Sequence, residues 1–423
     1  MGLETMAMSA MATLTDRPQL AAQLFRFTKW GSPFAPERFS YPYPMYDRMR
    51  ADGEIAWGKP YRQWFVFGYD EVNEVLKSTD TSTSRIGELM LSTPKFKRLT
   101  PTARANFSKW LLTVDDPDHV RLRSAVARAF TPKQVARYET LVSSATNELL
   151  AALPTTNSLD IVEAFTNRLP IRVIADILDL PAERRDWLHL ASRSVGAMLD
   201  ATAPFDPPEV SQRFDELDTE FRQLIEQRRQ SPGPDLVSAL VSESDGPQLS
   251  DDEITAMITF LLFAGHETIT GMLGTALVSL ERHPEQRALL RSTPELINNA
   301  VEELLRFDTS AQVTGRQATE DIKVGNTTIR KGQNVAVMVG AANRDQRRWP
   351  DADQLRLDRP DPSPISFGFG ARYCLGAALA RMQLRTAIPV LLNELGDYNI
   401  DHPNVTWKRS FTLRGPLRLP ITR

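Results

Sequence analysis

The sequence holds a single cysteine, Cys374, among its 423 residues. One cysteine excludes an internal disulfide framework and any metal cluster held by several thiolates, and it is typical of proteins from a reducing compartment. The chain also has little excess of either charge sign. Its 50 lysines and arginines nearly balance its 53 aspartates and glutamates, for a net charge of −3. This balance gives no electrostatic reason to expect binding to nucleic acid or to a membrane surface.

Long apolar runs are absent as well. A membrane-spanning helix needs roughly 18 consecutive apolar residues, whereas the densest run here covers only residues 258–264. Residues 1–15 lack the basic region and the apolar core of a signal peptide. We therefore expect a cytoplasmic protein that does not enter a membrane, and 42% hydrophobic and 24% charged residues indicate a globular one.

The surroundings of Cys374 indicate a ligand site. Residues 367–376 read Phe-Gly-Phe-Gly-Ala-Arg-Tyr-Cys-Leu-Gly, and the apolar residues 377–380 that follow are a predicted helix start. A helix N-terminus and nearby backbone N–H groups favour a thiolate, and glycines let the backbone approach a large flat group. A single thiolate can be the one protein ligand of a haem iron. A small buried hydrophobic residue is the simpler interpretation of a lone cysteine.

The longest predicted helix covers about residues 250–282 and opens with a capping box. Its middle, residues 263–268, reads Phe-Ala-Gly-His-Glu-Thr. Gly265 weakens a helix, Glu267 is a costly carboxylate in an apolar stretch, and Thr268 can bond the carbonyl one turn back. Three locally unfavourable residues so close together favour a functional site over a polar patch on a buried helix.

Two further pairs have helical spacing. His119 and Arg123 are four residues apart, so they share a helix face and suit a pair of carboxylates, although a solvated face explains them equally well. Glu303 and Arg306 are three residues apart and can pair, and for them an ordinary surface pair is the default interpretation.

The rest of the chain is mostly helical in pattern, above all over residues 134–230. Short strands are predicted after residue 306, at residues 318–324, 327–329 and 335–339. Residues 411–417 alternate enough to form a hairpin that reaches into a pocket. Irregular structure is predicted for a tail over residues 1–27, a long loop with short helical pieces over 81–112 and a polar loop over 231–249.

These motifs closely resemble those of the cytochrome P450 family. Residues 367–376 are similar to its haem-binding loop, Phe-Gly-x-Gly-x-(His/Arg)-x-Cys-x-Gly, and residues 264–268 to its oxygen-activation motif, (Ala/Gly)-Gly-x-(Asp/Glu)-Thr. The pair at 119 and 123 matches the family's propionate-binding helix, and the pair at 303 and 306 matches its Glu-x-x-Arg. The resemblance covers about residues 41–418, with all four motifs in the family's order.

The departures from the family pattern are small. Ser310 stands near a usual proline, Leu355 replaces a usual phenylalanine, and Arg372 replaces the commoner histidine. The resemblance implies a mainly α fold with smaller β-sheets. It also implies one domain over residues 28–423, with haem b between the long central helix and the cysteine loop.

The resemblance also implies roles for individual residues. Cys374 is expected to be the axial thiolate, whose electron donation favours O–O cleavage, and Glu267 and Thr268 are expected to deliver protons. Contacts to the cofactor are expected from His119, Arg123, Ala264, Gly265, Arg316, Phe367, Gly368, Arg372 and Gly376. The substrate pocket is expected to include Phe260, Phe263, Ala264, Gln312, Val313, Thr314 and Phe411, for each of which ordinary core packing is the alternative. Arg359 is expected to join Glu303 and Arg306 in a structural cluster.

The function implied is a monooxygenase that inserts one oxygen atom from dioxygen into a C–H or C=C bond of a small organic substrate. Electrons are expected to come ultimately from NAD(P)H through a ferredoxin reductase and a ferredoxin, because the chain has no flavin or ferredoxin segment. The alternatives are a peroxide-driven peroxygenase, a non-catalytic haem protein and a partner-binding subunit of a biosynthetic assembly line. The Glu267–Thr268 pair favours the dioxygen route. No motif identifies the substrate, and basic residues in 81–112 fit either a carrier-bound substrate or a solvated loop.

Overall fold

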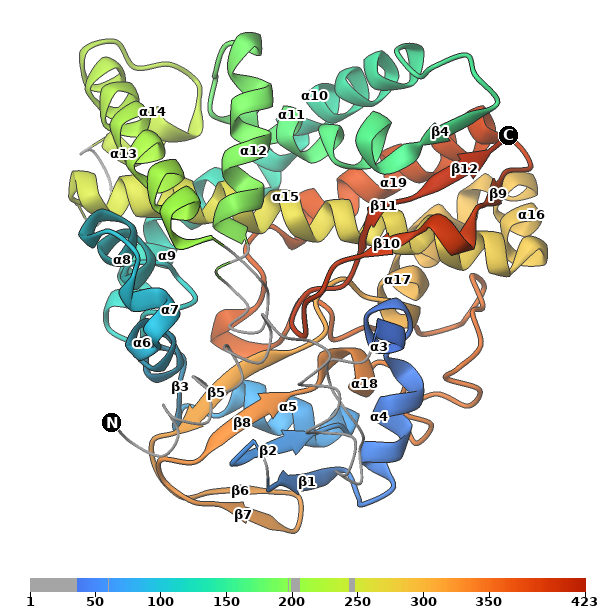
Figure 1. Ribbon diagram of the computed structural model, residues 1–423, viewed down its shortest axis with the longest axis horizontal. Helices are drawn as coiled ribbons and strands as arrows, with labels where there is room; N and C mark the ends of the chain where they lie inside the picture. Colours follow the sequence, from blue (N-terminus) through green and yellow to red (C-terminus); the bar gives the residue numbers. More distant parts are fainter. Residues whose placement is uncertain (1–35, 60, 197, 199–205, 243–247) are drawn as a thin grey trace.

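The computed structural model describes residues 36–423, except for residues 60, 197, 199–205 and 243–247. The tail predicted over residues 1–27 therefore lies outside the described residues. A long central helix divides the molecule in Figure 1 into a helical part above and a part below that contains the largest sheet.

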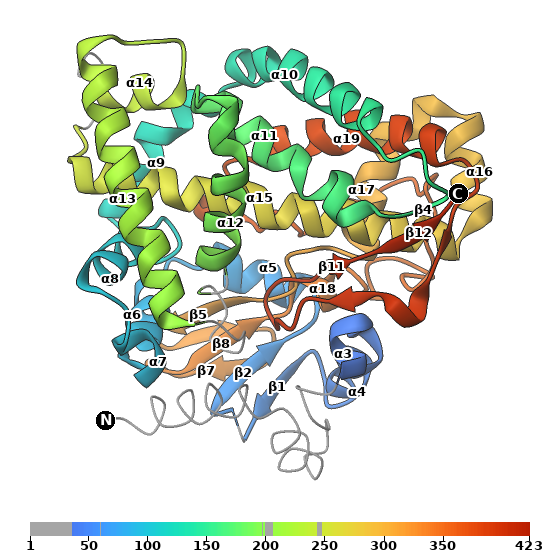
Figure 2. The same cartoon turned by 45° about the horizontal axis from the view of Figure 1, so that its top comes forward.

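The central helix is α15, Asp251–Arg282, and its capping box at Ser250 is present as predicted. Most of its side chains are buried, because α11 (Arg168–Ile177), α12 (Arg185–Gly196) and α13 (Pro207–Gln230) pack against it. Figure 2 shows α12 and α13 crossing it. Among the described helices only α15 is long and apolar enough to cross a membrane. However, 78% of its most apolar window is buried inside the protein, so its place in the core explains that composition.

The remaining α-helices surround α15 or support the sheets. They are α3 Pro36–Ser40, α4 Tyr43–Arg50, α5 Tyr69–Lys77, α6 Ser84–Ser92, α7 Pro94–Lys97, α8 Pro101–Ser108, α9 Asp118–Ala127, α10 Pro132–Ala151, α14 Leu236–Val241, α16 Pro284–Ser292, α17 Ile297–Phe307, α18 Val339–Ala342 and α19 Ala377–Leu395. Residues 134–230 are mainly helical, as predicted.

Two loop predictions are wrong in part. The segment 81–112 consists mainly of α6, α7 and α8 rather than of a long loop. The side chains of Thr93 and Thr100 accept hydrogen bonds from backbone N–H groups of α7 and α8, and a proline follows each of them at the first helical position. Such a cap followed by proline is a strong helix start. Within 231–249 the described residues include helix α14, whose N-cap is Asp235.

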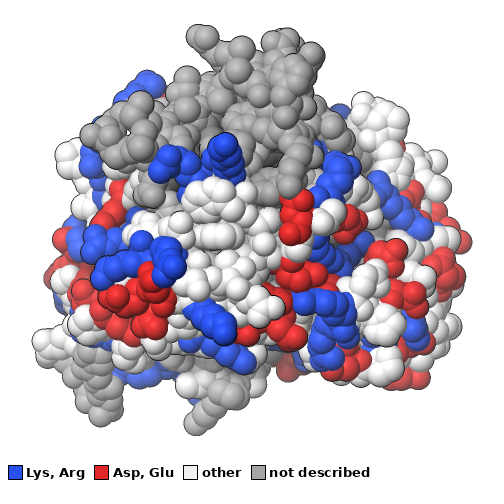
Figure 3. Space-filling view, turned by 90° about the horizontal axis from the view of Figure 1, so that it is seen from below, with Lys and Arg blue, Asp and Glu red and all other residues white. Residues whose placement is uncertain are grey.

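The largest sheet joins residues 55–82 to residues 314–337. Its strand order is β1 (Ile55–Gly58), β2 (Gln63–Val66), β8 (Asn334–Val337), β5 (Thr314–Ala318) and β3 (Thr81–Ser82), with only β2 and β8 parallel. β6 (Ile322–Val324) and β7 (Thr327–Ile329) form a separate hairpin. The strands predicted at 327–329 and 335–339 are present as β7 and β8, whereas the strand predicted at 318–324 is divided between the end of β5 and β6. Both charge signs are interspersed over the described part of the face in Figure 3.

The C-terminal segment forms two smaller sheets. β12 (Pro420–Thr422) lies between β4 (Ser158–Asp160) and β9 (Asn399–Ile400), while β10 (Thr406–Trp407) pairs with β11 (Pro416–Arg418). We call β10, β11 and the loop between them the C-terminal hairpin. It confirms the predicted hairpin in kind, although residues 411–413 lie in its loop rather than in a strand.

The C-terminal hairpin packs against α15 backbone to backbone. A Cβ atom added to Gly415 would lie 2.5 Å from the Cα of Gly271. The Ser310 hydroxyl, near the position where the family usually has proline, donates to the carbonyl of Arg414 at 2.8 Å. The Arg414 N–H donates back to the Ser310 carbonyl at 2.7 Å. The hairpin is therefore fixed both to the central helix and to the segment that follows α17.

Candidate active site

A cavity of about 430 Å³ lies between α15 and the loop that precedes α19. Its lining is mostly apolar, and it contains Cys374 together with Thr268 of the central helix. The predicted pocket and cofactor residues that line it are His119, Arg123, Phe260, Phe263, Ala264, Gly265, Val313, Thr314, Arg316, Phe367, Gly368, Arg372 and Gly376. The fold therefore brings motifs from four distant parts of the sequence to one space.

The loop carrying Cys374 is shaped by glycine. Gly368 and Gly370 have φ angles of 71° and 69°, a left-handed conformation that side chains disfavour. The Cys374 N–H donates to the Phe367 carbonyl at 2.8 Å, which closes the loop, and Gly376 is the N-cap of α19. Although protein surrounds Cys374, its side chain has accessible surface, which lies on the wall of the cavity.

The Cys374 thiol differs from expectation in one respect. Burial raises its pKa, and this effect outweighs the backbone N–H of Gly376 and the charges of Arg123 and Arg381, which lower it. The backbone N–H of Gly376 thus favours a thiolate, as predicted, but burial has the larger effect on the pKa of Cys374. A metal cation at the sulfur reverses that balance, because it stabilises the deprotonated form directly.

Arg316 is the strongest sign that the cavity takes an anion. Its side chain is only 6% exposed, and it donates to the Thr314 hydroxyl at 3.2 Å and to the Gly315 carbonyl at 2.8 Å. Among the described residues no carboxylate lies within ion-pair distance of it. Burial lowers the pKa of Arg316 to about 10. A buried guanidinium without a counter-charge fits an anionic ligand, such as a haem propionate, in the cavity.

The other predicted cations already have partners in the protein. Arg372 donates to Asp115 at 2.7 Å and to the Val114 carbonyl at 2.8 Å, while Arg123 donates to the Tyr373 carbonyl at 2.7 Å. His119 lies on α9 with Arg123, as predicted, and its Nδ1 is 3.3 Å from a carboxylate oxygen of Asp116.

Asp115 organises this side of the site, and sequence reasoning assigned it no role. Its carboxylate accepts hydrogen bonds from the hydroxyls of Ser82 and Ser84 and from the backbone N–H of Thr83. Burial alone raises its pKa, but these hydrogen bonds and the charge of Arg372 lower the pKa to about 2. An ionised Asp115 therefore holds Arg372 beside the cavity at neutral pH.

Glu267 and Thr268, which are predicted to deliver protons, lie in two different environments. The Thr268 hydroxyl donates to the Ala264 carbonyl at 2.7 Å, as predicted, and Thr268 lines the cavity. Glu267 is buried outside the lining, in an ion pair with Lys408 of the C-terminal hairpin. Burial raises the pKa of Glu267, but the charges of Lys408 and His266 lower it overall. Glu267 is therefore ionised at neutral pH.

Two predicted pocket residues, Gln312 and Phe411, are not among the residues that line the cavity. Gln312 does not line the cavity: its amide donates to the Thr309 carbonyl at 2.6 Å, and its side-chain oxygen accepts from the Tyr46 hydroxyl at 2.8 Å. Phe411 packs in a cluster on the sheet side of the molecule. The lining instead includes residues that periodicity did not single out, among them Ile86, Met90, Ile174, Thr309 and Leu413.

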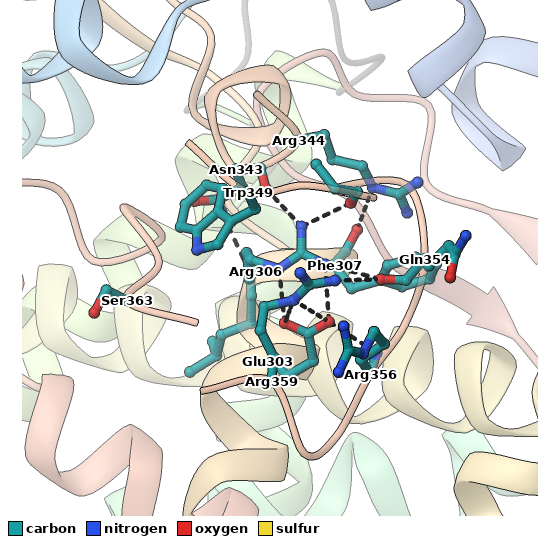
Figure 4. Close-up of polar contacts among 12 residues, drawn as sticks. Glu303, Arg306, Phe307, Asn343, Arg344, Trp349, Gln354, Arg356, Arg359 and Ser363 are labelled. Carbon is teal, nitrogen blue, oxygen red and sulfur yellow. Dashed lines mark hydrogen bonds and ion pairs between the residues drawn. The ribbon is translucent and has the colours of Figure 1, made fainter. Parts of the chain in front are cut away.

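The predicted structural cluster is present and fully buried (Figure 4). Glu303 accepts from Arg306 at 2.7 and 2.8 Å and from Arg359 at 3.1 Å, so Arg359 is the third member. We call these three residues the buried triad. The default interpretation of Glu303 and Arg306 as a surface pair is therefore wrong.

Comparisons with known proteins agree with this geometry. A family model described as Cytochrome P450 matches residues 208–396. The chain is 34% identical to "Putative cytochrome P450 123" of Mycobacterium tuberculosis over 90% of its own length and 94% of that protein. It is 32% identical to "Biotin biosynthesis cytochrome P450" of Bacillus subtilis over 90% of its length and 96% of that protein.

Solved structures give the same result. The crystal structure of CalO2 superposes with a TM-score of 0.86 at 31% identity, covering 92% of this chain and 98% of that one. The structure of P450BioI in complex with hexadec-9Z-enoic acid ligated Acyl Carrier Protein has a TM-score of 0.84 at 30% identity, covering 92% and 100%. The likeness therefore extends over nearly all of the described chain.

Proposed function

The chain belongs to the cytochrome P450 family, whose members bind haem and are generally haem-thiolate monooxygenases, and we propose that it inserts one oxygen atom from dioxygen into a C–H or C=C bond of a small organic substrate. The observation that carries this proposal is the cavity in which Cys374, Thr268 and the buried Arg316 meet. When bound, haem b supplies the redox chemistry at its iron.

The residues of the chain have distinct tasks in this proposal. Cys374 is the protein ligand of the iron, and Arg316, with help from His119, Arg123 and Arg372, neutralises the propionates. Phe367, Gly368, Gly376, Ala264 and Gly265 complete the cofactor contacts. We propose that residues 28–423 act as a single domain, which is supported by a cavity lining that comes from segments between Leu76 and Leu413.

Thr268 and Glu267 have different roles in proton delivery. Thr268 presents a hydroxyl to the cavity, and Glu267 lies beside it in sequence but behind the lining. Glu267 would pass protons to Thr268, whose hydroxyl oxygen would hold them at the wall of the cavity. A positioned donor of this kind typically contributes roughly 10²–10⁴-fold in rate.

The substrate is a largely apolar molecule. Phe260, Phe263, Ala264, Val313 and Thr314 line the cavity, and the apolar side chains of Ile86, Met90 and Leu413 extend its wall. Such walls bind apolar surface and exclude water from the reaction. Electrons come ultimately from NAD(P)H through a ferredoxin reductase and a ferredoxin in the cytoplasm.

The absorption spectrum of the reduced, CO-bound protein tests this function. We expect the Soret band at the position typical of a thiolate ligand, and we expect Cys374→Ala to lose it. A band typical of an imidazole ligand in the wild-type protein, or a protein that takes up no haem, would contradict the proposal. A library of small apolar compounds, screened by the shift of the same band, then identifies ligands of the cavity.

The role of Thr268 has its own test. We expect Thr268→Ala to keep consuming NAD(P)H while it forms less product and more hydrogen peroxide, because the hydroxyl at the cavity is lost. Thr270→Ala is the matched control, since Thr270 lies on the same helix but donates to the Thr166 carbonyl and does not line the cavity. Equal coupling in the wild type and in Thr268→Ala rules out the assigned role.

A further inference from the structure

A second pocket, of about 510 Å³, lies at the surface between α10, α11 and α12. Its lining is strongly charged, with four arginines and two acids: Arg168, Arg172, Arg185, Arg193, Glu163 and Asp186. Several of these side chains are exposed, so the pocket is accessible to solvent. It also contains His189, whose ring centroid lies 5.4 Å from that of His266 on α15. The two imidazoles connect this surface pocket to the central helix.

Polar atoms continue inward from His189. Ser192 is one turn further along α12, and its hydroxyl is 2.8 Å from Nδ1 of His266. The same Nδ1 lies 3.7 Å from a carboxylate oxygen of Glu267. Ser192 and His266 are fully buried, at 0% exposure. We call His189, Ser192, His266 and Glu267 the histidine–carboxylate cluster.

His266 lowers the stability of the fold if its role is purely structural. Its second ring nitrogen, Nε2, is buried and has no hydrogen-bond partner among the residues that the structure describes. A buried polar atom without a partner costs about 1–3 kcal/mol, whereas an apolar side chain fills a helix position without that cost. The site therefore retains an imidazole despite a penalty, which indicates a functional requirement.

His266 also has the chemistry of a neutral proton carrier. Burial lowers its pKa to about 3, an effect that the charges of His189, Lys408 and Arg193 reinforce and that of Glu267 opposes. At neutral pH one ring nitrogen carries hydrogen and the other accepts it. Because Ser192 and Glu267 both lie near Nδ1, this nitrogen can take up a proton from one side and release it to the other, while Nε2 keeps its hydrogen.

We propose that His189, Ser192 and His266 form a proton path from the surface pocket between α11 and α12 to Glu267, separate from the substrate cavity. This inference rests on the monooxygenase function proposed above. Each turnover combines a substrate, dioxygen, two electrons from the external protein donor and two protons to give the oxygenated product and water. The protons come from solvent, and every group of the path ends the cycle in its starting protonation state.

The path needs two movements, and the first is a turn of His189, whose ring centroid is 5.4 Å from that of His266, into hydrogen-bond reach of Ser192 or His266. The carboxylate of Glu267 is held by Lys408, and turning it from Lys408 towards His266 closes the 3.7 Å gap. Glu267 can then pass the proton to Thr268. His189 and His266 touch neither substrate nor cofactor and act through Glu267, so they are positioning residues.

The test compares His266→Asn with the wild-type holoenzyme. Asparagine keeps a polar group within reach of Ser192, but its amide does not take up and release a proton as an imidazole does. We expect product per electron consumed to fall about tenfold, peroxide to rise, and the solvent deuterium isotope effect on turnover to increase. The CO-bound spectrum and the ligand-induced spectral shift should not change. His283→Asn is the matched control, because His283 follows α15 and its Nδ1 bonds the Ser279 carbonyl instead.

His189→Gln provides a second, independent variant at a half-buried position. We expect the same increase in isotope effect, and we expect the His189→Gln/His266→Asn double variant to be no worse than the more impaired single variant, because both act on one path. In haem-free protein labelled with ¹⁵N-histidine, His266 should stay neutral from about pH 8 to about pH 5.

The outcomes separate the two proposals. If the wild-type protein lacks the thiolate-type CO band and forms no product, the monooxygenase function fails and the path fails with it. If the wild-type protein turns over substrate and both histidine variants match its coupling and isotope effect, the path alone is overturned. A loss of coupling in His283→Asn equal to that in His266→Asn also overturns it.

Discussion

The molecule contains two buried charged clusters on neighbouring helices, and they differ in how completely their groups are partnered. In the buried triad, both carboxylate oxygens of Glu303 accept from arginine, and every guanidinium nitrogen of Arg306 and Arg359 donates to Glu303 or to a backbone carbonyl (Figure 4). In the histidine–carboxylate cluster, Nε2 of His266 has no partner, and Glu267 depends on Lys408, whose side chain is 20% exposed.

This difference separates a structural from a functional use of buried charge. A fully hydrogen-bonded network in a low-dielectric interior fixes one geometry, since any movement breaks several strong bonds at once. A partly satisfied network has more than one arrangement of similar energy. The triad therefore fixes the chain around α17, whereas the cluster on α15 is suited to moving protons.

The largest expected effect is on the triad. Glu303→Gln leaves two buried arginines without their counter-charge, so we expect the free energy of unfolding to fall by about 3–5 kcal/mol. Chemical denaturation measures it. Glu302→Gln is the matched control on the same helix, because Glu302 pairs with Arg381 at a site about one-fifth exposed and should cost about 1 kcal/mol or less. Equal losses in the two variants would contradict the distinction.

A smaller effect is expected at the α15 cluster. Lys408→Met removes the main counter-charge of Glu267 and leaves a buried carboxylate, so we expect a loss of about 2–3 kcal/mol at pH 7 and a higher pKa for Glu267. Adding Glu267→Gln should recover most of that loss, because the unpaired charge is removed. A double variant no more stable than Lys408→Met shows that the two side chains are not coupled.

The smallest effect is a pH dependence. The pKa of His266 is about 3 in the folded protein and about 6.5 in an unfolded chain. Between these values the unfolded state binds the proton and the folded state does not, so stability falls as pH decreases. Relative to His266→Asn, the wild type should lose about 2 kcal/mol between about pH 7 and pH 5. Parallel stability curves for the two proteins would show that His266 is not buried in neutral form.

Local spacing predicted much of the fold and of the site. The capping box at Ser250, the helix with His119 and Arg123, the bond of Thr268 to its own helix and the cysteine loop all depend on residues near one another in sequence. Helical periodicity states which residues share a face, and short-range hydrogen bonds follow from it.

Long-range partners could not be predicted in this way. Nothing in the spacing of Glu267 indicates Lys408, which is brought to it by the hairpin at the other end of the chain. The same holds for the ion pair of Asp115 with Arg372 and for the burial of Gln312 beside Tyr46. These depend on which segments pack together. The helices at 94–97 and 101–108, by contrast, could have been predicted from sequence, because each begins with a threonine N-cap followed by proline.

The contact between Gly271 and Gly415 has a consequence for engineering. The hairpin that it seats on α15 carries Leu413, which forms part of the cavity wall, and Lys408, which keeps Glu267 ionised. A side chain at either glycine would force the hairpin away from α15 and displace both groups together. In the proposed monooxygenase, this glycine pair therefore affects two properties: substrate preference and the share of electrons that end in product. A library of variants directed at this hairpin will change both properties at once.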